Sequence, residues 1–231
     1  MQGDRAFALM FDDLDCPPAP TLPWLSKRYF AVQNDWPDLA RLRCHYDTDH
    51  HRLRVELDSQ LVLDAQVDDD RAAIGAWFNT FLDTCQPSPG ARHPQKAPIT
   101  LVGETSGATG FRDRRTGQVS ILGSATLEAL SATLHTPIDP RRFRPNIVLE
   151  TAEPWEEFNW IGQRLRLGAV ELTAIEPIER CLNIEVCPDS GQRNLPLLAT
   201  LKREFHHLTV GIIAQVTHGG TLSIGEGYDI L

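Results

Sequence analysis

LRLGAVELTAI, residues 165–175, predicts two short strands, over 165–167 and 170–175, because leucine and β-branched side chains dominate both. The same reasoning predicts further strands over residues 52–57, 99–102, 147–149, 184–186, 210–216 and 221–224, the last two joined by a turn at residues 218–220. Many short strands at close intervals favour a mainly β fold with a few helices (α+β), curled into a barrel or closed sheet.

Three segments have helical periodicity instead. We expect Asp68 to Asp70 to cap the first helix and Ser124 to cap the second, while the third begins near Asn194. Their apolar positions are predicted to face the core: Ile74, Trp77, Phe78, Phe81 and Leu82; Leu127, Leu130 and Leu134; Leu197, Leu198 and Leu201.

A proline-rich segment divides the chain. Residues 86–98 hold four prolines and a glycine, which is typical of a loop or linker. We therefore expect two domains, over residues 1–90 and 91–231. The whole chain of 231 residues is long enough to bury a hydrophobic core.

Composition excludes several classes of protein. The formal net charge of -9 argues against a nucleic-acid partner, which usually faces a basic surface. No apolar run approaches a membrane span, and the N-terminal residues 1–5 lack the basic and apolar regions of a signal peptide, so we expect no membrane association and a cytoplasmic location. The five cysteines lack the spacing of a zinc site, so we expect mostly reduced thiols. They also lack the clustered pattern of an iron-sulfur site, so any electrons for a redox reaction would come from another protein.

The segment RCLNIEVCPDSG, residues 180–191, is the first candidate for chemistry. Arg180 stands beside Cys181, and a neighbouring cation favours the thiolate, which binds soft metals. Two alternatives stay open: a small buried hydrophobe, or a disulfide with Cys187, which a straight strand between them disfavours.

A second candidate is DPRRFRPNIV, residues 139–148. Three arginines in four positions suit recognition of phosphate or pyrophosphate. The alternative is a solvated basic turn balanced by the acidic residues 150–157. Adjacent histidines at 50–51 and 206–207 point in different directions on a strand or helix, so we interpret them as surface residues.

Five segments in one order carry a family resemblance: FRPNIV (143–148), WEEFNWIG (155–162), LRLG (165–168), residues 180–191 and GTLSIGE (220–226). They resemble the landmarks of MOSC domains, the family of the molybdenum cofactor sulfurase C-terminal domain. The upstream part from GDRAFAL (3–9) is similar to the β-barrel module that precedes this domain in bacterial members and in mitochondrial amidoxime-reducing proteins. The resemblance implies a MOSC-type β-barrel after an N-terminal β-barrel-like subdomain.

The resemblance also implies a cofactor and its ligands. Cys181 stands where the family's cysteine coordinates molybdenum, beside two sulfurs from the pterin of the molybdenum cofactor (molybdopterin). Arg144 and Asn146 correspond to a segment that binds the pterin and its phosphate, and Arg5 to a further phosphate contact. Arg180 and Asn183 are expected beside the metal ligand.

The chain departs from the family pattern in places. Members usually begin with another strand and a Tyr-Pro-Val-Lys-like segment before Gly-Asp-Arg, so we expect a start that is truncated. Cys187, Phe158, Asn194 and Glu226 stand where the family commonly has other, mostly acidic, residues.

The resemblance implies an enzyme: a molybdenum-dependent oxidoreductase that reduces small N-hydroxylated compounds with electrons from a separate electron-transfer protein. The alternative is a module that binds or carries the cofactor, or a sulfur on the metal, without catalysis. A third hypothesis is a folded relic without a cofactor.

Overall fold

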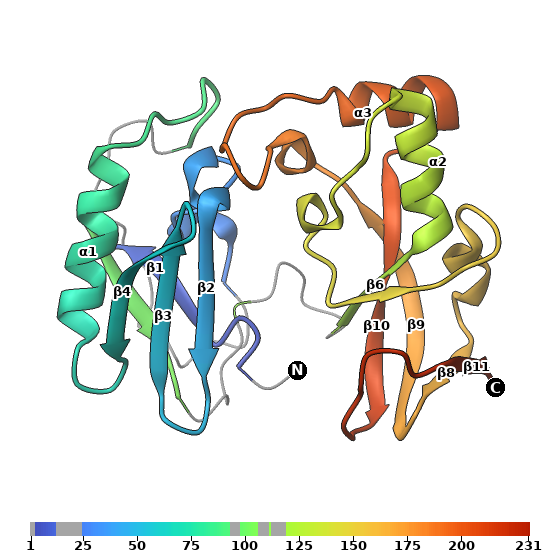
Figure 1. Ribbon diagram of the computed structural model, residues 1–231, viewed down its shortest axis with the longest axis horizontal. Helices are drawn as coiled ribbons and strands as arrows, with labels where there is room; N and C mark the ends of the chain where they lie inside the picture. Colours follow the sequence, from blue (N-terminus) through green and yellow to red (C-terminus); the bar gives the residue numbers. More distant parts are fainter. Residues whose placement is uncertain (1–2, 13–24, 93–97, 106–110, 112–118) are drawn as a thin grey trace. The chain divides into compact units, whose positions relative to one another are not determined.

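The computed structural model describes residues 3–12, 25–92, 98–105, 111 and 119–231. The chain forms two compact units. Unit 1 comprises residues 1–115 together with 186–195, and unit 2 comprises residues 116–185 and 196–231. Short strands predominate in the described part of both units, and helices are few (Figure 1), so the prediction of a mainly β fold with a few helices is confirmed. The domain division at residue 90 stays a prediction.

Unit 1 is built from two small antiparallel sheets and a helix. Strands β2 (Leu42–Asp47), β3 (Arg52–Leu57) and β4 (Gln60–Gln66) form one sheet, and β1 (Phe7–Phe11) pairs with β5 (Ile99–Gly103) in the other. Helix α1 (Arg71–Asp83) packs on β5. Its predicted apolar stripe is confirmed, because Ile74, Phe78, Phe81 and Leu82 are buried and Trp77 packs against the same core.

The start of α1 differs from the prediction. Asp70 is the N-cap residue, but its carboxylate accepts a hydrogen bond from the Gln66 backbone N–H (2.9 Å) and none from the helix. Asp68 instead pairs with the His51 ring (2.7 Å). These aspartates therefore fix the turn between β4 and α1 rather than cap the helix.

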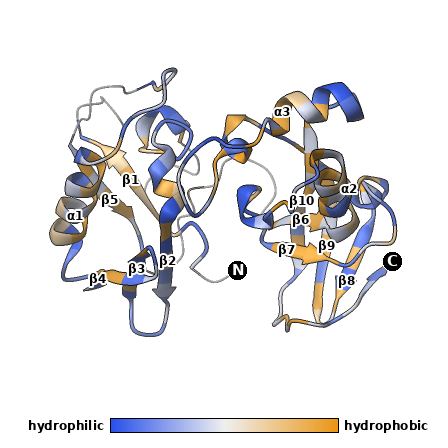
Figure 2. Ribbon diagram, turned by 45° about the horizontal axis from the view of Figure 1, so that its top comes forward, coloured by the Kyte–Doolittle hydropathy of each residue, from blue (hydrophilic) through white to orange (hydrophobic). Residues whose placement is uncertain are grey.

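Unit 2 contains a six-stranded sheet in the order β11-β8-β9-β10-β6-β7, curled into a half-barrel. Neighbours are antiparallel except β6 and β7, which are parallel and joined through α2, as a parallel pair requires a crossover. Figure 2 shows hydrophobic stretches along β5 of unit 1 and β9 of unit 2, where the two cores lie. The bounds are β6 (Val119–Gly123), α2 (Ser124–Leu134), β7 (Ile147–Leu149), β8 (Arg164–Leu167), β9 (Val170–Glu179), α3 (Leu197–Thr200), β10 (Thr209–His218) and β11 (Tyr228–Ile230).

Two predicted strands are wrong. Residues 184–186 lie at the end of a short 3-10 helix, Leu182–Glu185, where Ile184 is buried by packing and not by strand pairing. Residues 221–224 form no strand: Leu222 and Ile224 are exposed, so they have no apolar face to bury. The chain regains strand structure only at β11, which pairs with β8.

The junction between β6 and α2 is organised by side chains from a distant segment. Thr151 Oγ1 accepts from the Ala125 N–H (3.1 Å), so Thr151 and not Ser124 caps the helix. Glu157, fully buried, accepts from Thr126 Oγ1 (3.0 and 3.2 Å). A Cβ at Gly123 would lie 2.7 Å from the Glu157 carboxylate, which is why glycine is required there.

No helix in the described ranges has the length and apolar character needed to span a membrane.

An aromatic cluster surrounds one histidine of unit 2. His207 packs edge-on against Trp155, with ring centroids 4.7 Å apart, and its ring also contacts Phe158 and Phe205. Its Nδ1 accepts from the Thr209 backbone N–H (3.2 Å), and burial lowers the pKa of this imidazole. The prediction of a surface residue is therefore wrong for His207, although His206 is exposed.

The lowered pKa predicts a pH dependence of stability. A base whose pKa is lower in the folded state stabilises the fold fully above its unfolded pKa, about 6.5, and this contribution is lost as the pH falls through the folded value. We expect the free energy of unfolding, measured in urea, to fall less between pH 7.5 and pH 5.5 for His207→Phe than for wild type. His206→Gln is the matched control and should keep the wild-type dependence; equal pH dependence in all three proteins would contradict the prediction.

Candidate functional site

Cys181 lies at the start of a tight turn in unit 2. It follows β9 and precedes the 3-10 helix Leu182–Glu185, where the Ile184 N–H donates to the Cys181 carbonyl (3.2 Å). The Cys181 side chain is exposed, and neither Cys181 nor Cys187 is in a disulfide, so the disulfide that the sequence left open is not formed. The buried-hydrophobe alternative is also excluded for Cys181.

The Arg180 guanidinium holds this turn in place. Its Nε donates to the Val210 carbonyl on β10 (2.8 Å), to which Nη2 donates as well, and Nη1 donates to the Phe143 carbonyl (3.1 Å). The Phe143 ring lies against the guanidinium, 5.4 Å from centroid to Cζ. The Arg180 side chain thus connects the start of the Cys181 turn to β10 and to Phe143, the residue before Arg144.

Gly211 makes room for this arrangement. Its φ is +70°, and a Cβ there would lie 2.6 Å from the Ile121 carbonyl and 3.3 Å from Arg180 Nη2. A side chain at this position would collide with the neighbouring strand, and its backbone conformation favours glycine.

The three arginines of residues 141–144 have three different environments. Arg141 pairs with Asp139 (2.6 Å) across the start of a 3-10 turn. Arg142 is buried and donates to the Glu185 carbonyl (3.0 Å), which closes the turn that begins at Cys181. Arg144 is exposed, has a φ of +52°, and its guanidinium makes no hydrogen bond or ion pair with the described residues. Among the three, Arg144 therefore offers its guanidinium to an external anion.

Asn146 anchors the segment after Arg144. Its Oδ1 accepts from both the backbone N–H (2.9 Å) and the hydroxyl (3.0 Å) of Ser120 on β6, and its own N–H donates to the Ser120 carbonyl (3.0 Å). These bonds fix where β7 begins beside β6. The Asn146 carbonyl oxygen is thus engaged within the protein.

Asn183 lies within the Cys181 turn. Its Oδ1 is buried and has no hydrogen-bond partner within the described protein. A buried acceptor without a partner costs about 1 to 3 kcal/mol, so this atom is suited to a donor that the chain does not supply.

Arg5 lies in unit 1. Its φ is +53°, its guanidinium pairs with Asp4, and its carbonyl accepts from the Phe111 N–H (2.8 Å). The other five predicted site residues all belong to unit 2. Hydrogen bonds of Arg180 and Arg142 bring the segments of Cys181, Asn183, Arg144 and Asn146 together there.

Sequence reasoning missed two contributors to this arrangement. Arg142 was part of the predicted basic segment, but nothing in the pattern distinguishes it from its neighbours as the buried one. Gly211 lies within a predicted strand, where an isolated glycine indicates a close backbone approach. That signal was present in the sequence.

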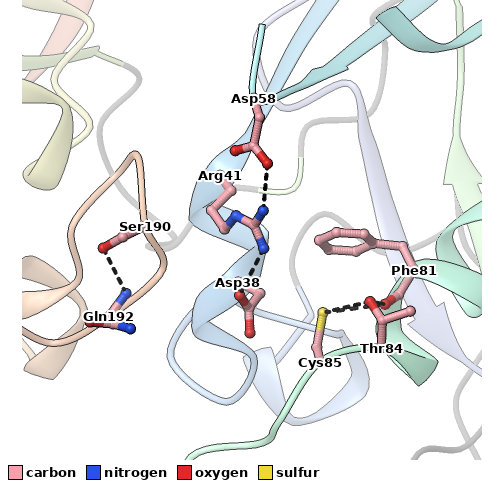
Figure 3. Close-up of polar contacts among 8 residues, drawn as sticks. All are labelled: Asp38, Arg41, Asp58, Phe81, Thr84, Cys85, Ser190 and Gln192. Atoms are coloured by element: carbon pink, nitrogen blue, oxygen red, sulfur yellow. Dashed lines mark hydrogen bonds and ion pairs between the residues drawn. The ribbon is translucent and has the colours of Figure 1, made fainter. Parts of the chain in front are cut away.

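The other described cysteines differ from Cys181. Cys85 is buried, and burial raises the pKa of its thiol, which donates to the Phe81 carbonyl (3.3 Å; Figure 3). Cys44 is exposed on β2 of unit 1. The described residues hold no group of three or more Cys, His, Asp or Glu side chains arranged to bind a metal ion.

Comparisons with known proteins identify relatives. The family model of the MOSC domain matches residues 106–228. Molybdenum cofactor sulfurase of Oryza sativa subsp. japonica is 29% identical over 131 residues, which cover 46% of this chain and 16% of that protein. Mitochondrial amidoxime reducing component 2 of Homo sapiens is 32% identical over 119 residues, which cover 46% of this chain and 35% of that protein. The matched regions thus span about a third or less of these relatives.

A solved structure, the YuaD protein of Bacillus subtilis, aligns with a TM-score of 0.42 at 17% identity, over 61% of this chain and 72% of that one. Similarity at this level does not establish a common fold.

The Arg180 contacts predict a large effect of substitution. A hydrogen bond from a charged group contributes about 1.5 to 3 kcal/mol, so we expect Arg180→Ala to lower the free energy of unfolding by about 2 to 3 kcal/mol. Arg180→Lys should recover only part, because an ammonium cannot reach both carbonyls as a planar fork does. Urea denaturation measures this, with the exposed Arg166→Ala as the control; a loss no larger than in the control would contradict the assigned role.

Proposed function

Because this chain belongs to the MOSC domain family, we propose that it binds a molybdenum cofactor (molybdopterin) with Cys181 as the protein's thiolate ligand to the metal. The observation that carries this proposal is the position of the thiol. Cys181 is exposed, with a free thiol, at the start of a turn. Arg180 and Arg142 fix this turn through hydrogen bonds to the Val210 and Glu185 carbonyls. A fixed, accessible thiolate is a ligand that soft metals prefer.

The surroundings fit an anionic cofactor. Arg144 presents an exposed guanidinium without a contact to the described residues, from a backbone with positive φ. A non-glycine residue in that conformation costs about 1 to 3 kcal/mol and occurs preferentially at functional sites. Guanidinium forks suit phosphate, and Asn183 Oδ1, which has no hydrogen-bond partner among the described residues, would accept from a donor such as a pterin N–H.

Each residue then has a distinct role in the proposal. Cys181 would ligate the metal, Arg144 would contact phosphate, and Asn183 would accept a hydrogen bond, while the phosphate contact of Arg5 stays an expectation from the family resemblance. Arg180 and Asn146 would position these groups through their hydrogen bonds to backbone, since their described contacts are with the protein itself. When bound, the cofactor would supply a redox-active metal with an open position for substrate oxygen.

For the reaction, we propose reduction of small N-hydroxylated compounds. The human relative's name, an amidoxime reducing component, supports this substrate class. The absence of clustered cysteines in the sequence supports a separate electron-transfer protein as the electron source.

A second candidate function is a carrier of the cofactor or of a sulfur on the metal, without turnover. The similarity to a molybdenum cofactor sulfurase, 29% identical over 131 residues, favours this candidate. Cys181 and Arg144 would serve both functions alike, so only a turnover assay separates them.

Cofactor binding predicts a metal content. Purified from a host that makes the cofactor, wild type should contain close to one molybdenum per chain, and Cys181→Ser should contain much less because a hydroxyl is a poorer ligand than a thiolate. Arg144→Ala should retain several-fold less cofactor, whereas Arg141→Ala, whose guanidinium pairs with Asp139, should behave as wild type. The measurement is elemental analysis together with pterin fluorescence. Molybdenum absent from wild type and Cys181→Ser alike would sink the cofactor proposal.

Catalysis predicts turnover with an artificial donor. The loaded wild type should reduce benzhydroxamidine or hydroxylamine with reduced viologen as the electron source, and Cys181→Ser should lose at least tenfold in rate. Loss of viologen colour and the amidine product measure this. A fully loaded protein without turnover would favour the carrier.

A further inference from the structure

A hollow of about 580 Å³ lies in unit 1, at the turn that joins β2 to β3 (Figure 1). We call it the hairpin hollow. The turn supplies Asp49, His50 and His51, and the adjoining strands supply the other lining residues, all of which belong to unit 1. Every lining side chain is polar or charged, so the hollow is suited to a charged ligand rather than to an apolar one.

The turn brings two adjacent histidines to the same hollow. On a regular strand their side chains would point to opposite faces, but His51 has a φ of +50°, which breaks the alternation. The backbone of the turn is fixed by side chains. Asp47 Oδ1 accepts from the N–H groups of Asp49 (3.0 Å) and His50 (3.1 Å), and Gln66 Nε2 donates to the His50 carbonyl (2.7 Å). Both imidazoles therefore extend from a braced turn.

Each imidazole is held by a carboxylate through the same ring nitrogen. His50 Nδ1 lies 2.8 Å from Asp47 Oδ2, and His51 Nδ1 lies 2.7 Å from Asp68 Oδ2. The hydrogen bond from the histidine lowers the pKa of each carboxyl group, so both are ionised at neutral pH and can only accept. Nδ1 therefore carries the hydrogen, and Nε2 of each neutral ring keeps its lone pair.

Histidines that bind metal ions have this arrangement. A metal-ligating imidazole almost always donates its other ring N–H to a carboxylate, a backbone carbonyl or water, which fixes the tautomer and makes the ligating nitrogen more basic. Neither Nε2 makes a hydrogen bond or ion pair with the described residues. The side chains are 77% exposed for His50 and 40% for His51, so both nitrogens are accessible to an ion from solvent.

The charges around the hairpin hollow favour a cation. The charged residues that line it, or pair with its lining residues, are two arginines and four aspartates: Arg52, Arg54, Asp47, Asp49, Asp64 and Asp68. With neutral imidazoles their charges sum to -2. Arg71 of α1 acts on Asp68 and brings the sum to -1, which is still negative. An anion would therefore be disfavoured, although two arginines line the hollow, because both already pair with Asp64.

We propose that the hairpin hollow is a site for a divalent transition-metal ion, such as Ni²⁺ or Zn²⁺, bound by Nε2 of His50 and Nε2 of His51. Imidazole nitrogens suit these metals, and the volume of the hollow leaves room for the water molecules that complete the coordination. Asp47 and Asp68 are the positioning residues. The site has two protein ligands, fewer than the three that a closed protein site would need, and it is separate from the cofactor proposed at Cys181.

The test is a calorimetric titration of Ni²⁺ into the full chain. Wild type should bind Ni²⁺, and His50→Gln and His51→Gln should each weaken binding at least about tenfold, because each removes one of the two protein ligands. His206→Gln removes an exposed histidine of unit 2 and is the matched control, which should keep the wild-type affinity. Any binding to thiols is common to these four proteins, so the differences among them report the imidazoles.

Asp68→Asn tests the positioning role. The substitution keeps the size of the side chain but replaces the carboxylate that accepts from His51, so Ni²⁺ affinity should fall about 10- to 100-fold, as for other partners of ligating histidines. Asp64→Asn removes the same charge from a residue that pairs with Arg52 and Arg54 and not with an imidazole. It should lower the affinity less than Asp68→Asn does.

A direct measurement on wild type needs no variant to fold. Ni²⁺ is paramagnetic, so at a small fraction of the protein concentration it should broaden the ring signals of His50 and His51 first among the eight histidines in an NMR spectrum. Broadening that begins at other histidines, or an affinity that is unchanged in both His50→Gln and His51→Gln, would overturn the proposal. Equal losses in Asp68→Asn and Asp64→Asn would also overturn it, because charge alone would then explain the binding.

Discussion

The fork of the Arg180 guanidinium is the interaction on which the Cys181 turn depends. It binds a carbonyl on β10 and a carbonyl beside Arg144, so that segments 37 and 30 residues away along the chain converge on one side chain. Backbone carbonyls cannot be removed by mutation, which makes them durable acceptors. Gly211 lies beside this fork, and a Cβ there would lie 2.6 Å from the Ile121 carbonyl and 3.3 Å from Arg180 Nη2.

A division of labour among charged residues follows from this arrangement. Arg180 and Arg142 direct their guanidinium groups inward to carbonyls, where a planar cation with several donors satisfies more than one acceptor. Arg144 directs its group outward, from a backbone conformation that a non-glycine residue seldom adopts. The inward pair builds the scaffold, and the outward residue carries the affinity that we propose for a phosphate-bearing cofactor.

Membership in the MOSC domain family gives this geometry its functional interpretation. The thiol of Cys181 is exposed at the turn and forms no disulfide. The buried thiol of Cys85 illustrates the contrast: burial raises its pKa and it fills space in the unit 1 core. Environment, not residue type, separates the two cysteines.

The sequence by itself determined the features that depend on local pattern. Alternation predicted β3 at its observed bounds, and apolar periodicity predicted the buried face of α1. These succeed because side-chain direction repeats every two residues in a strand and every 3.6 in a helix, so nearby positions carry the signal.

Only the tertiary structure decided what depends on distant partners. Residues 184–186 became the end of a turn because Arg142 and Arg180 hold the preceding residues, and residues 221–224 became irregular because no strand pairs with them. Thr151 accepts a hydrogen bond from the first turn of α2, 26 residues away, and Arg193 donates to Ser88, 105 residues away. Each of these features depends on hydrogen bonds between segments far apart in the chain. A short stretch of sequence does not contain both partners of such a bond.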